Sequence, residues 1–585
     1  MPGIYGLVSS ETNSTKNIAK MMNAMNLYPH FVNDEVFDDS IVTSSKVHLG
    51  HNKDRFKNEF DDSISVWVEG EAYNLSQMRD DFDFDFDFNL ASALKSAYKN
   101  DKLNDFLNKL DGYFCGVLYD QSTSEIKLIS DRYGMRMLYW YWNNEQFAWA
   151  SEVKGILALD GVDKTIDPTS FQCFMELGYL LGEHTWFDKI KLIKPATIVT
   201  FNIKDKLLSE QYYWKWSEII PSNISFDDAV EKLGKLFIEA VEKRFDVNEH
   251  IGVAISGGMD SRAIFAAIKT LHPEHNGAAY TFGIKGCDDI RIAELVINKP
   301  NSQKWDYKKF FFNQHNWFEP RHEMIWNTDG MQDMMHMHGG EFLDDISEHM
   351  SIMVNGYSGD VILGGGFLGR VPFNVRASKD NLRSFFKSHV SLINVDDDFY
   401  DIERVEPILQ MNRVRRFTAM GTVNTLVKID HRKPFFDNKV VELVYSLPDE
   451  YRKNNKLYSA MLIKFFPEYF KDIPWQKTGK PVGILKKPTL VTRAFRKILR
   501  DMRSIVGIKS LQEYTDYANW IRDEEISNYL LTLLDKKTAC YAELTELDLS
   551  EKFLIPHLKG KRVNNSNEIL RAATIELYLR NVNKY

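Results

Sequence analysis

The stretch IGVAISGGMDSRAIFAAI, residues 251–268, decides the fold of the second half of this chain. Its first residues form a short apolar run that predicts a buried strand, and the residues after Ser261 return to the apolar spacing of a helix. A strand, a glycine-rich turn and a helix N-terminus together form an anion site, because backbone N–H groups and the helix dipole face the same point. A tight connection without a ligand is the alternative. No lysine follows Gly257 and Gly258, which argues against a Walker-type phosphate loop.

Outward from this stretch, strand-like and helix-like patterns alternate from about residue 224 onward. Residues 226–245 have the periodicity of an amphipathic helix, and residues 278–284 and 351–356 are apolar runs of the buried-strand type. This pattern predicts a parallel α/β sheet followed by a largely helical extension over residues 216–585.

Residues 1–215 have a different pattern, with short β-rich runs separated by turn residues. Examples are residues 63–74, 111–120 and 147–152. Many strands without long helices between them predict packed antiparallel sheets, so the expected fold class is a two-domain α/β and α+β protein. The alternating run DDFDFDFDF at residues 80–88 predicts an edge strand with phenylalanines on one face, and a calcium or partner site is the alternative.

Charge and composition argue against several classes of protein. The formal net charge of -9 does not suit general nucleic-acid binding. No uncharged apolar run reaches the roughly 18 residues of a membrane span, and no signal-peptide pattern is visible, so we expect no membrane association. The four cysteines are scattered without metal or disulfide spacing, and we therefore expect a reducing, cytoplasmic location.

The sequence SGGMDS at residues 256–261 resembles the pyrophosphate-binding loop of the ATP pyrophosphatase family, whose members cleave ATP to AMP and pyrophosphate. Across almost the whole chain, the resemblance is to the asparagine synthetase-like enzymes. It rests on MPGIYG, GEAYN, LDGYFCGVLYD, DRYGMRMLYW, ASEVKGIL, IDHRKPFFDNKVVELVYSLP and IPWQKTGKP, which follow the family's order. The resemblance implies an N-terminal β-sandwich of glutaminase (Ntn) type over residues 1–215 and an ATP pyrophosphatase domain over residues 216–585.

The same resemblance implies the cofactors ATP and Mg²⁺ and the residues that hold them. Asp260 matches a magnesium-binding aspartate, and Asp360 in VNGYSGDVILGGG matches a second one. Lys477 falls where the family keeps a catalytic lysine, which would stabilise the tetrahedral oxyanion and the departing charge. The implied nucleotide-binding residues are Ile255, Ser256, Gly257, Gly258, Asp260, Ser261, Phe282 and Gly356.

Two departures from the family pattern lie in the N-terminal half. Glutamine-hydrolysing members use a cysteine at position two as the nucleophile, whereas this chain has Pro2, which has neither a thiol nor a hydroxyl. An asparagine that helps to form their oxyanion hole is replaced by Glu69, whose carboxylate would repel an oxyanion. We therefore expect this domain to keep its fold without hydrolysing glutamine.

A third departure is Tyr357, which stands where asparagine synthetases have a glutamate. The pattern GY-x-x-D resembles β-lactam synthetase and carbapenam synthetase, in which the tyrosine pairs with a glutamate at the position of Asp430. A substrate amine must lose a proton before it attacks an acyl-adenylate, and a tyrosine held by a carboxylate can accept that proton. The alternatives are that Tyr357 is an aromatic of the pocket wall and that Lys477 is an exposed loop lysine.

Three further features leave alternatives open. Asp333, His336 and His338 are either packing residues or a metal or substrate site. Arg262 is either a solvent-exposed residue at a helix start or a phosphate contact. The basic residues within 486–509 form either a solvated helix face or a docking site for an acidic peptide.

The sequence therefore predicts a Mg²⁺-dependent, AMP-forming synthetase that makes an amide or lactam from a substrate amine. A β-lactam-type or lasso-peptide-type cyclisation in secondary metabolism fits this pattern. The alternatives are an asparagine synthetase-like enzyme supplied with free ammonia and a catalytically inactive nucleotide-binding module. The expected partners are a small molecule or peptide that carries a carboxylate and an amine, a second copy of the chain, or other enzymes of a biosynthetic cluster. Nucleic acid and membrane are not expected partners.

Overall fold

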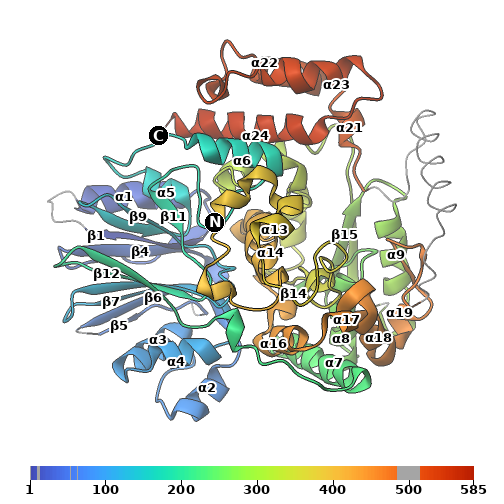
Figure 1. Cartoon of the computed structure of the whole chain (residues 1–585), viewed down its shortest axis with the longest axis horizontal. Coiled ribbons are helices and arrows are strands. Elements are labelled where there is room, and N and C mark those ends of the chain that lie inside the picture. Colours follow the sequence, from blue (N-terminus) through green and yellow to red (C-terminus); the bar gives the residue numbers. More distant parts are fainter. Residues whose placement is uncertain are drawn as a thin grey trace.

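The structure is a computed structural model that describes residues 2–8, 14–52, 55–61, 63–302, 304–483 and 514–584. An N-terminal pair of antiparallel sheets lies beside a parallel sheet that is surrounded by helices (Figure 1). Among the helices of the described residues, none has the length and the apolar stretch that crossing a bilayer requires.

The N-terminal part consists of two antiparallel sheets. The first has the strand order β11-β9-β10-β1-β4-β2, with β3 also paired to β4, and the second has the order β13-β12-β8-β7-β6-β5. The strands are β1 (Gly3–Val8), β2 (Phe31–Asn33), β3 (Phe37–Asp38), β4 (Val42–Leu49), β5 (Glu59–Phe60), β6 (Ile64–Ala72), β7 (Gly112–Asp120), β8 (Glu125–Ser130), β9 (Tyr139–Trp142), β10 (Phe147–Ala150), β11 (Ile190–Leu192), β12 (Thr197–Asn202) and β13 (Leu207–Tyr212). The predicted strands at 63–74, 111–120 and 147–152 are β6, β7 and β10.

The two sheets are covered by helices on their outer faces. Buried side chains from both sheets, including Trp67, Val117 and Trp149, form one apolar cluster. Helices α1 (Ser14–Met25) and α5 (Val153–Leu157) pack on the first sheet, and α3 (Leu90–Lys99) packs on the second (Figure 1). This helix–sheet–sheet–helix layering confirms the predicted antiparallel sandwich.

The prediction of a strand at residues 80–88 is wrong. Helix α2 (Leu75–Phe82) ends at Asp83, which has the left-handed φ of 52°, and the chain is irregular from there to Phe88. The rings of Phe82, Phe84 and Phe86 lie 5.4, 6.3 and 6.3 Å from that of Phe106 on α4 (Leu103–Lys109). The phenylalanines therefore gather on one side, as the alternation suggested, but they pack on a helix and need no partner strand.

The second half contains a five-stranded parallel sheet with the order β16-β15-β14-β17-β18, which confirms the predicted parallel α/β domain. Its strands are β14 (Ile251–Ala254), β15 (Ala278–Gly283), β16 (Asp306–Phe311), β17 (Ile352–Val354) and β18 (Asp430–Arg432). The chain starts the sheet at β14, adds β15 and β16 on one side, and then returns to add β17 and β18 on the other side. The strand order therefore reverses at β14. Open α/β sheets bind ligands at the carboxyl ends of the strands at such a point.

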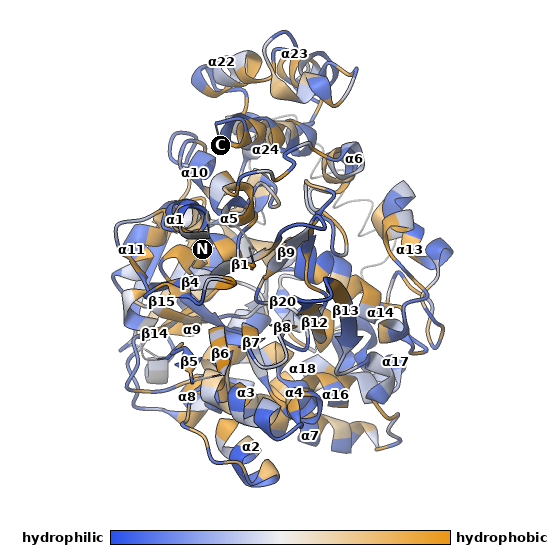
Figure 2. Cartoon of the chain, turned by 90° about the vertical axis from the view of Figure 1, so that its left-hand side faces the viewer, coloured by the Kyte–Doolittle hydropathy of each residue, from blue (hydrophilic) through white to orange (hydrophobic). Residues whose placement is uncertain are grey.

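Helices surround this sheet and continue to the end of the described chain. The predicted helices at 226–245 and after the glycine turn are α7 (Phe226–Glu242) and α8 (Asp260–Leu271), which pack against each other. The long C-terminal helix α24 (Ser566–Val582) packs on α6 (Pro168–Leu177) of the first half and on α10 (Pro320–Asn327) of the second. Hydrophobic residues lie along α24 beneath α22 (Glu524–Leu533) and α23 (Ile555–Lys559) (Figure 2), which is typical of a helix covered on several sides.

Candidate active site

A cavity of about 750 Å³ opens where β14, β15 and β17 end. This volume falls in the roughly 300–1,000 Å³ range that is typical of small-molecule sites. Apart from Gly257 and Asp430, every residue that sequence analysis assigned to the nucleotide, the metal or catalysis lies in its wall. These wall residues are Ile255, Ser256, Gly258, Asp260, Ser261, Phe282, Gly356, Tyr357, Asp360 and Lys477.

The glycine loop, residues 255–261, connects β14 to α8. The Ser256 N–H donates to Ser261 Oγ at 3.1 Å, and the Gly258 N–H donates to Ser256 Oγ at 3.2 Å. The Gly257 N–H instead donates to Asp289 Oδ1 at 2.8 Å, and Asp289 is itself a wall residue. A Cβ atom on Gly257 would lie 2.8 Å from Cβ of Gln476, so this glycine is required by a neighbouring chain segment.

The two predicted metal-binding aspartates lie side by side. Asp260 begins α8, and Asp360 lies in α12 (Gly359–Ile362), which follows β17. The Asp360 N–H donates to Asp260 Oδ2 at 2.9 Å, and the Tyr458 hydroxyl donates to Asp260 Oδ1 at 3.0 Å. Burial and then the Asp360 charge raise the pKa of Asp260 well above its usual range, and burial also raises the pKa of Asp360. Two neighbouring buried carboxylates disfavour each other's charge unless a proton or a cation lies between them.

This carboxylate pair fits a magnesium ion shared with a phosphate group. Mg²⁺ prefers hard oxygen ligands and is usually held by one or two carboxylates together with substrate phosphates and water. Among the described residues, no three His, Cys, Asp or Glu side chains cluster as a self-sufficient metal site. Asp260 and Asp360 therefore supply two ligands, and bound phosphate oxygens and water would complete the set.

Lys477 enters the cavity from a hairpin in the C-terminal half. It lies in the turn between β19 (Pro474–Trp475) and β20 (Lys480–Pro481), with its Nζ 5.4 Å from the Trp475 ring centroid. Its charge lowers the pKa of Asp360 against the larger effect of burial. Among the described wall residues, Lys477 carries the only full positive charge, so it is the side chain that can stabilise anionic oxygen there.

The predicted pairing of Tyr357 with Asp430 is wrong. The hydroxyl of Tyr357 donates to the carbonyl oxygen of Val414, and burial raises the pKa of Tyr357 well above its usual range. Asp430 Oδ1 instead accepts from Arg136 at 3.0 Å and from the His431 N–H at 2.9 Å. Burial by itself would raise the pKa of Asp430. Arg136 and Arg55, both from the N-terminal half, act together with the His431 N–H and lower this pKa to about 2. Asp430 is therefore an interface residue, and Tyr357 is a wall residue without this carboxylate.

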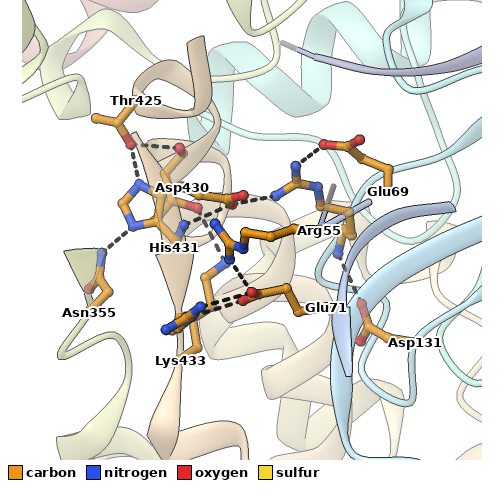
Figure 3. Close-up of polar contacts among 12 residues, drawn as sticks. Arg55, Glu69, Glu71, Asp131, Asn355, Thr425, Asp430, His431 and Lys433 are labelled. Atoms are coloured by element: carbon orange, nitrogen blue, oxygen red, sulfur yellow. Dashed lines mark hydrogen bonds and ion pairs between the residues drawn. The ribbon is translucent and has the colours of Figure 1, made fainter. Parts of the chain in front are cut away.

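Asp430 belongs to a buried ion-pair network that the sequence did not reveal (Figure 3). Arg136 bridges Glu69 of β6 and Asp430 of β18, and the side chains of all three are at least 95% buried. Beside it, Arg432 pairs with Glu71 at 2.9 Å and with Glu249. The available signal was Glu69, a charged residue directly after the apolar run at residues 66–68 of β6, which required a cationic partner once buried.

A second chain of polar contacts leads from this network to the cavity wall. Burial lowers the pKa of His431 to about 3, so its ring is neutral. The Thr425 hydroxyl donates to the Thr422 carbonyl at 2.9 Å, so it accepts from His431 Nε2, and Nδ1 accepts from the Asn355 amide at 3.1 Å (Figure 3). Asn355 lines the cavity next to Gly356. The side-chain amide of Asn355 therefore has a fixed orientation.

The remaining sequence candidates are not part of the cavity. Asp333 pairs with Arg571 at 3.2 Å and caps the Met335 N–H, while His338 contacts the Tyr517 hydroxyl at 2.9 Å, which supports the packing interpretation. Both interpretations of Arg262 are wrong, because its side chain is fully buried and lies outside the cavity wall. The predicted basic face at 486–509 lies outside the described residues.

Comparisons with known proteins divide the chain in the same way. Residues 1–214 match the family described as glutamine amidotransferase domain, and residues 232–471 match the family described as asparagine synthase. Putative asparagine synthetase [glutamine-hydrolyzing] 1 of Methanocaldococcus jannaschii is 22% identical over 470 residues, which cover 78% of this chain and 76% of the relative. Asparagine synthetase [glutamine-hydrolyzing] 3 of Bacillus subtilis is 24% identical, with 72% and 76% covered. A second Methanocaldococcus jannaschii relative, putative asparagine synthetase [glutamine-hydrolyzing] 2, is 21% identical, with 55% of this chain and 64% of the relative covered. The match to this last relative therefore spans slightly less than two thirds of its length.

Proposed function

Because this chain belongs to the asparagine synthetase family, we propose that it is an ATP-dependent, AMP-forming ligase that joins a carboxylate to an amine without hydrolysing glutamine. The observation that supports this proposal most directly is the contact between Asp260 and Asp360 beneath a cavity that also contains Lys477. The wall of this cavity combines a carboxylate pair suited to magnesium, a glycine loop and a single cation, at the point where the strand order reverses.

The proposed reaction has two steps. A substrate carboxylate oxygen attacks the α-phosphorus of ATP, so a carbon–oxygen–phosphorus link forms and the bond to the β-phosphate breaks, releasing pyrophosphate. An amine nitrogen then attacks the acyl carbon, AMP leaves with the electron pair of the broken carbon–oxygen bond, and the amine loses a proton. Both steps build negative charge on oxygen, which preorganised positive groups stabilise.

The residues of the cavity would divide these tasks. The glycine loop and the start of α8 would bind the phosphates, and Phe282 and Gly356 would contact the nucleoside. Asp260 and Asp360 would hold Mg²⁺, whose charge would neutralise that of the phosphates. Lys477 would approach the acyl and phosphoryl oxygens. The Tyr357 hydroxyl is neutral and donates to a backbone carbonyl, so it contributes shape to the wall in this proposal and does not take the proton.

The N-terminal half supports the view that glutamine is not the nitrogen donor. Pro2 lies buried before β1 and offers no nucleophile. Glu69 is buried and bonded to Arg136, so a carboxylate occupies the position that an oxyanion hole would need. The N-terminal half would instead support the active site, because Arg136 forms an ion pair with Asp430, the first residue of β18.

The preferred amine is one carried by the substrate, including an amine on the same molecule as the carboxylate, as in β-lactam or macrolactam formation. The GY-x-x-D pattern and the missing nucleophile support this choice. The second candidate is formation of a primary amide such as asparagine from free ammonia, which the names of the relatives favour.

Pyrophosphate release tests the proposal. The full-length chain is incubated with MgATP and, in turn, with aspartate plus ammonium chloride, with β-amino acids and with short peptides, and AMP and pyrophosphate are measured. Substrate-dependent formation of both, lost in Lys477→Met and Asp360→Asn but kept in the surface control Lys102→Met, is expected. Formation of ADP, or release of glutamate from added glutamine, would contradict the corresponding part of the proposal.

A further inference from the structure

Arg262 connects two segments of the chain that are far apart in sequence. It lies in the first turn of α8, and its side chain is fully buried. Its Nη2 donates to the carbonyl oxygens of Gly257 at 3.1 Å and Pro474 at 2.9 Å, while Nη1 donates to those of Ile473 at 3.3 Å and Tyr469 at 3.4 Å. One guanidinium group thus joins the glycine loop to residues 469–474.

The second of these segments leads directly to the lysine of the cavity. Pro474 begins β19, and Lys477 follows three residues later. The carbonyl of Gly257, which accepts from Arg262, also accepts from the Gln476 N–H at 3.1 Å. The Gln476 side chain donates to Asp289 at 2.6 Å, and Asp289 accepts from the Gly257 N–H. The turn that contains Lys477 is therefore held to the glycine loop through the carbonyl of Gly257 directly and through its N–H by way of Asp289.

The chemistry of arginine suits this connection. A guanidinium group is planar and presents five donors in a fixed fork, whereas a lysine ammonium is a single compact point of charge. Burial lowers the pKa of Arg262 only to about 10, so the group remains charged at neutral pH. Its cation also lies 5.2 Å from the Phe470 ring centroid. Neither lysine nor an apolar side chain can satisfy four carbonyls in two segments at once.

We propose that Arg262 is a positioning residue that holds Lys477 above the glycine loop, so that the phosphate chain of a bound nucleotide is contacted from both sides. Arg262 lies outside the cavity wall and acts through the hairpin and the loop that it joins. The proposal rests on the proposed function only in taking the ligand of the cavity to be a phosphate chain.

A double-mutant cycle on pyrophosphate binding tests this proposal without knowledge of the substrate. The affinity of the full-length chain for inorganic pyrophosphate with Mg²⁺ is measured by calorimetry for Arg262→Met, Lys477→Met and the double variant. We expect each single change to weaken binding by roughly 10-fold and the double change to weaken it no further, because coupled residues are not additive. Full additivity of the two losses would overturn the proposal.

Two controls separate positioning from misfolding. Arg262→Lys keeps the positive charge and most of the side-chain volume but cannot bond to both segments. It should therefore weaken pyrophosphate binding nearly as much as Arg262→Met does. Arg291→Met removes an exposed arginine of α9 (Asp288–Ile297) that pairs with Asp288, and it should leave binding unchanged. Melting temperatures identify any variant that does not fold.

Hydrogen exchange gives a readout that does not need a ligand. In Arg262→Met, a peptide that contains Gln476 and Lys477 should exchange faster, because the Gln476 N–H loses its anchored acceptor, while Arg291→Met should not change it. Unchanged exchange would overturn the proposal. If the unmodified protein binds neither pyrophosphate nor ATP, the proposed function fails, and the exchange measurement still decides the role of Arg262.

Discussion

The guanidinium of Arg136 lies 3.0 Å from the carboxylate of Asp430, and these two residues come from different halves of the chain. Asp430 begins the edge strand of the parallel sheet, and Arg136 lies in the loop between β8 and β9. The same guanidinium also pairs with Glu69. Asp430, which was expected to assist catalysis, thus connects the parallel sheet to the N-terminal half through Arg136. The N-terminal half therefore supports the wall of the candidate active site.

Arg136→Met should strongly destabilise the protein. It would leave Glu69 and Asp430 buried without their shared cation, and breaking a buried ion pair costs roughly 3–5 kcal/mol. Urea unfolding of the variant and the unmodified chain measures the loss. Lys102→Met, which removes an exposed pair with Asp105, should change the free energy of unfolding by less than about 1 kcal/mol. Equal effects of the two changes would show that the interface network contributes little.

Tyr357→Phe should keep most of the activity. The change removes one hydrogen bond to the Val414 carbonyl and keeps the ring in the cavity wall. We expect the rate of amide formation to fall by less than about 10-fold, since a neutral hydrogen bond contributes roughly 0.5–1.5 kcal/mol. Single-turnover assays of pyrophosphate release and of amide formation measure the two steps. A selective loss of amide formation of more than about 100-fold, which corresponds to the general acid–base range, would instead identify Tyr357 as the proton acceptor.

Asp360→Asn should remove most of the stabilisation by MgATP. For the unmodified chain, a ligand at 100 times its dissociation constant adds about 2.7 kcal/mol to stability, and the variant should gain far less. Because the pKa values of Asp260 and Asp360 are both raised, protons compete with the metal, so Mg²⁺ affinity should increase as the pH rises. Thermal unfolding with and without MgATP and calorimetry at two pH values measure both effects. Affinity that is independent of pH would contradict the role of the carboxylate pair.

Lys433→Met should stabilise the protein most at low pH. The Lys433 ammonium is buried between the Tyr113 and Tyr357 rings and donates to Thr422, and Asp131, Arg136 and Asp430 act on it from nearby. Burial lowers its pKa from 10.5 to about 7, so between these values the unfolded chain binds the additional proton and stability rises with pH. The variant escapes this penalty. Its advantage should be full below pH 7 and should disappear as the pH approaches 10.5.

Urea midpoints at pH 6 and pH 9 measure this difference. The surface variant Lys235→Met, which removes an exposed i,i+4 pair with Glu231, serves as the control and should show no such trend. A gain that is the same at both pH values would show that Lys433 does not titrate in this range.

Pro2→Cys should not produce a glutaminase. The thiol would be restored next to β1, but Glu69 would remain bonded to Arg136 at the position of the oxyanion hole. Release of glutamate from glutamine by Pro2→Cys, compared with the unmodified chain and with Pro2→Ala, measures this expectation. Glutamate release by Pro2→Cys alone would show that the N-terminal site is still competent.

Local patterns in the sequence predicted most of the fold. The local residue pattern predicted the strand, glycine turn and helix around Gly257, and it also predicted the long strands β6 and β7. The contacts that were predicted wrongly depend on residues that are distant in the sequence. Arg136 and Asp430 are 294 positions apart, and Arg262 and Pro474 are 212 apart. The sequence around Arg262 indicates that it lies at the start of a helix, but it does not indicate which distant carbonyl groups its side chain contacts.

The buried charges between the two halves also limit how chimeric enzymes can be assembled from relatives. A transplanted N-terminal half that lacked Arg136 or Glu71 would remove a buried cation from Asp430 or one of the two carboxylates that pair with Arg432. In such a chimera, the charged residues on both sides of the interface would have to be exchanged together, including Asp430 and Arg432 of β18. Mutations on the two sides are therefore expected to arise in compensating pairs.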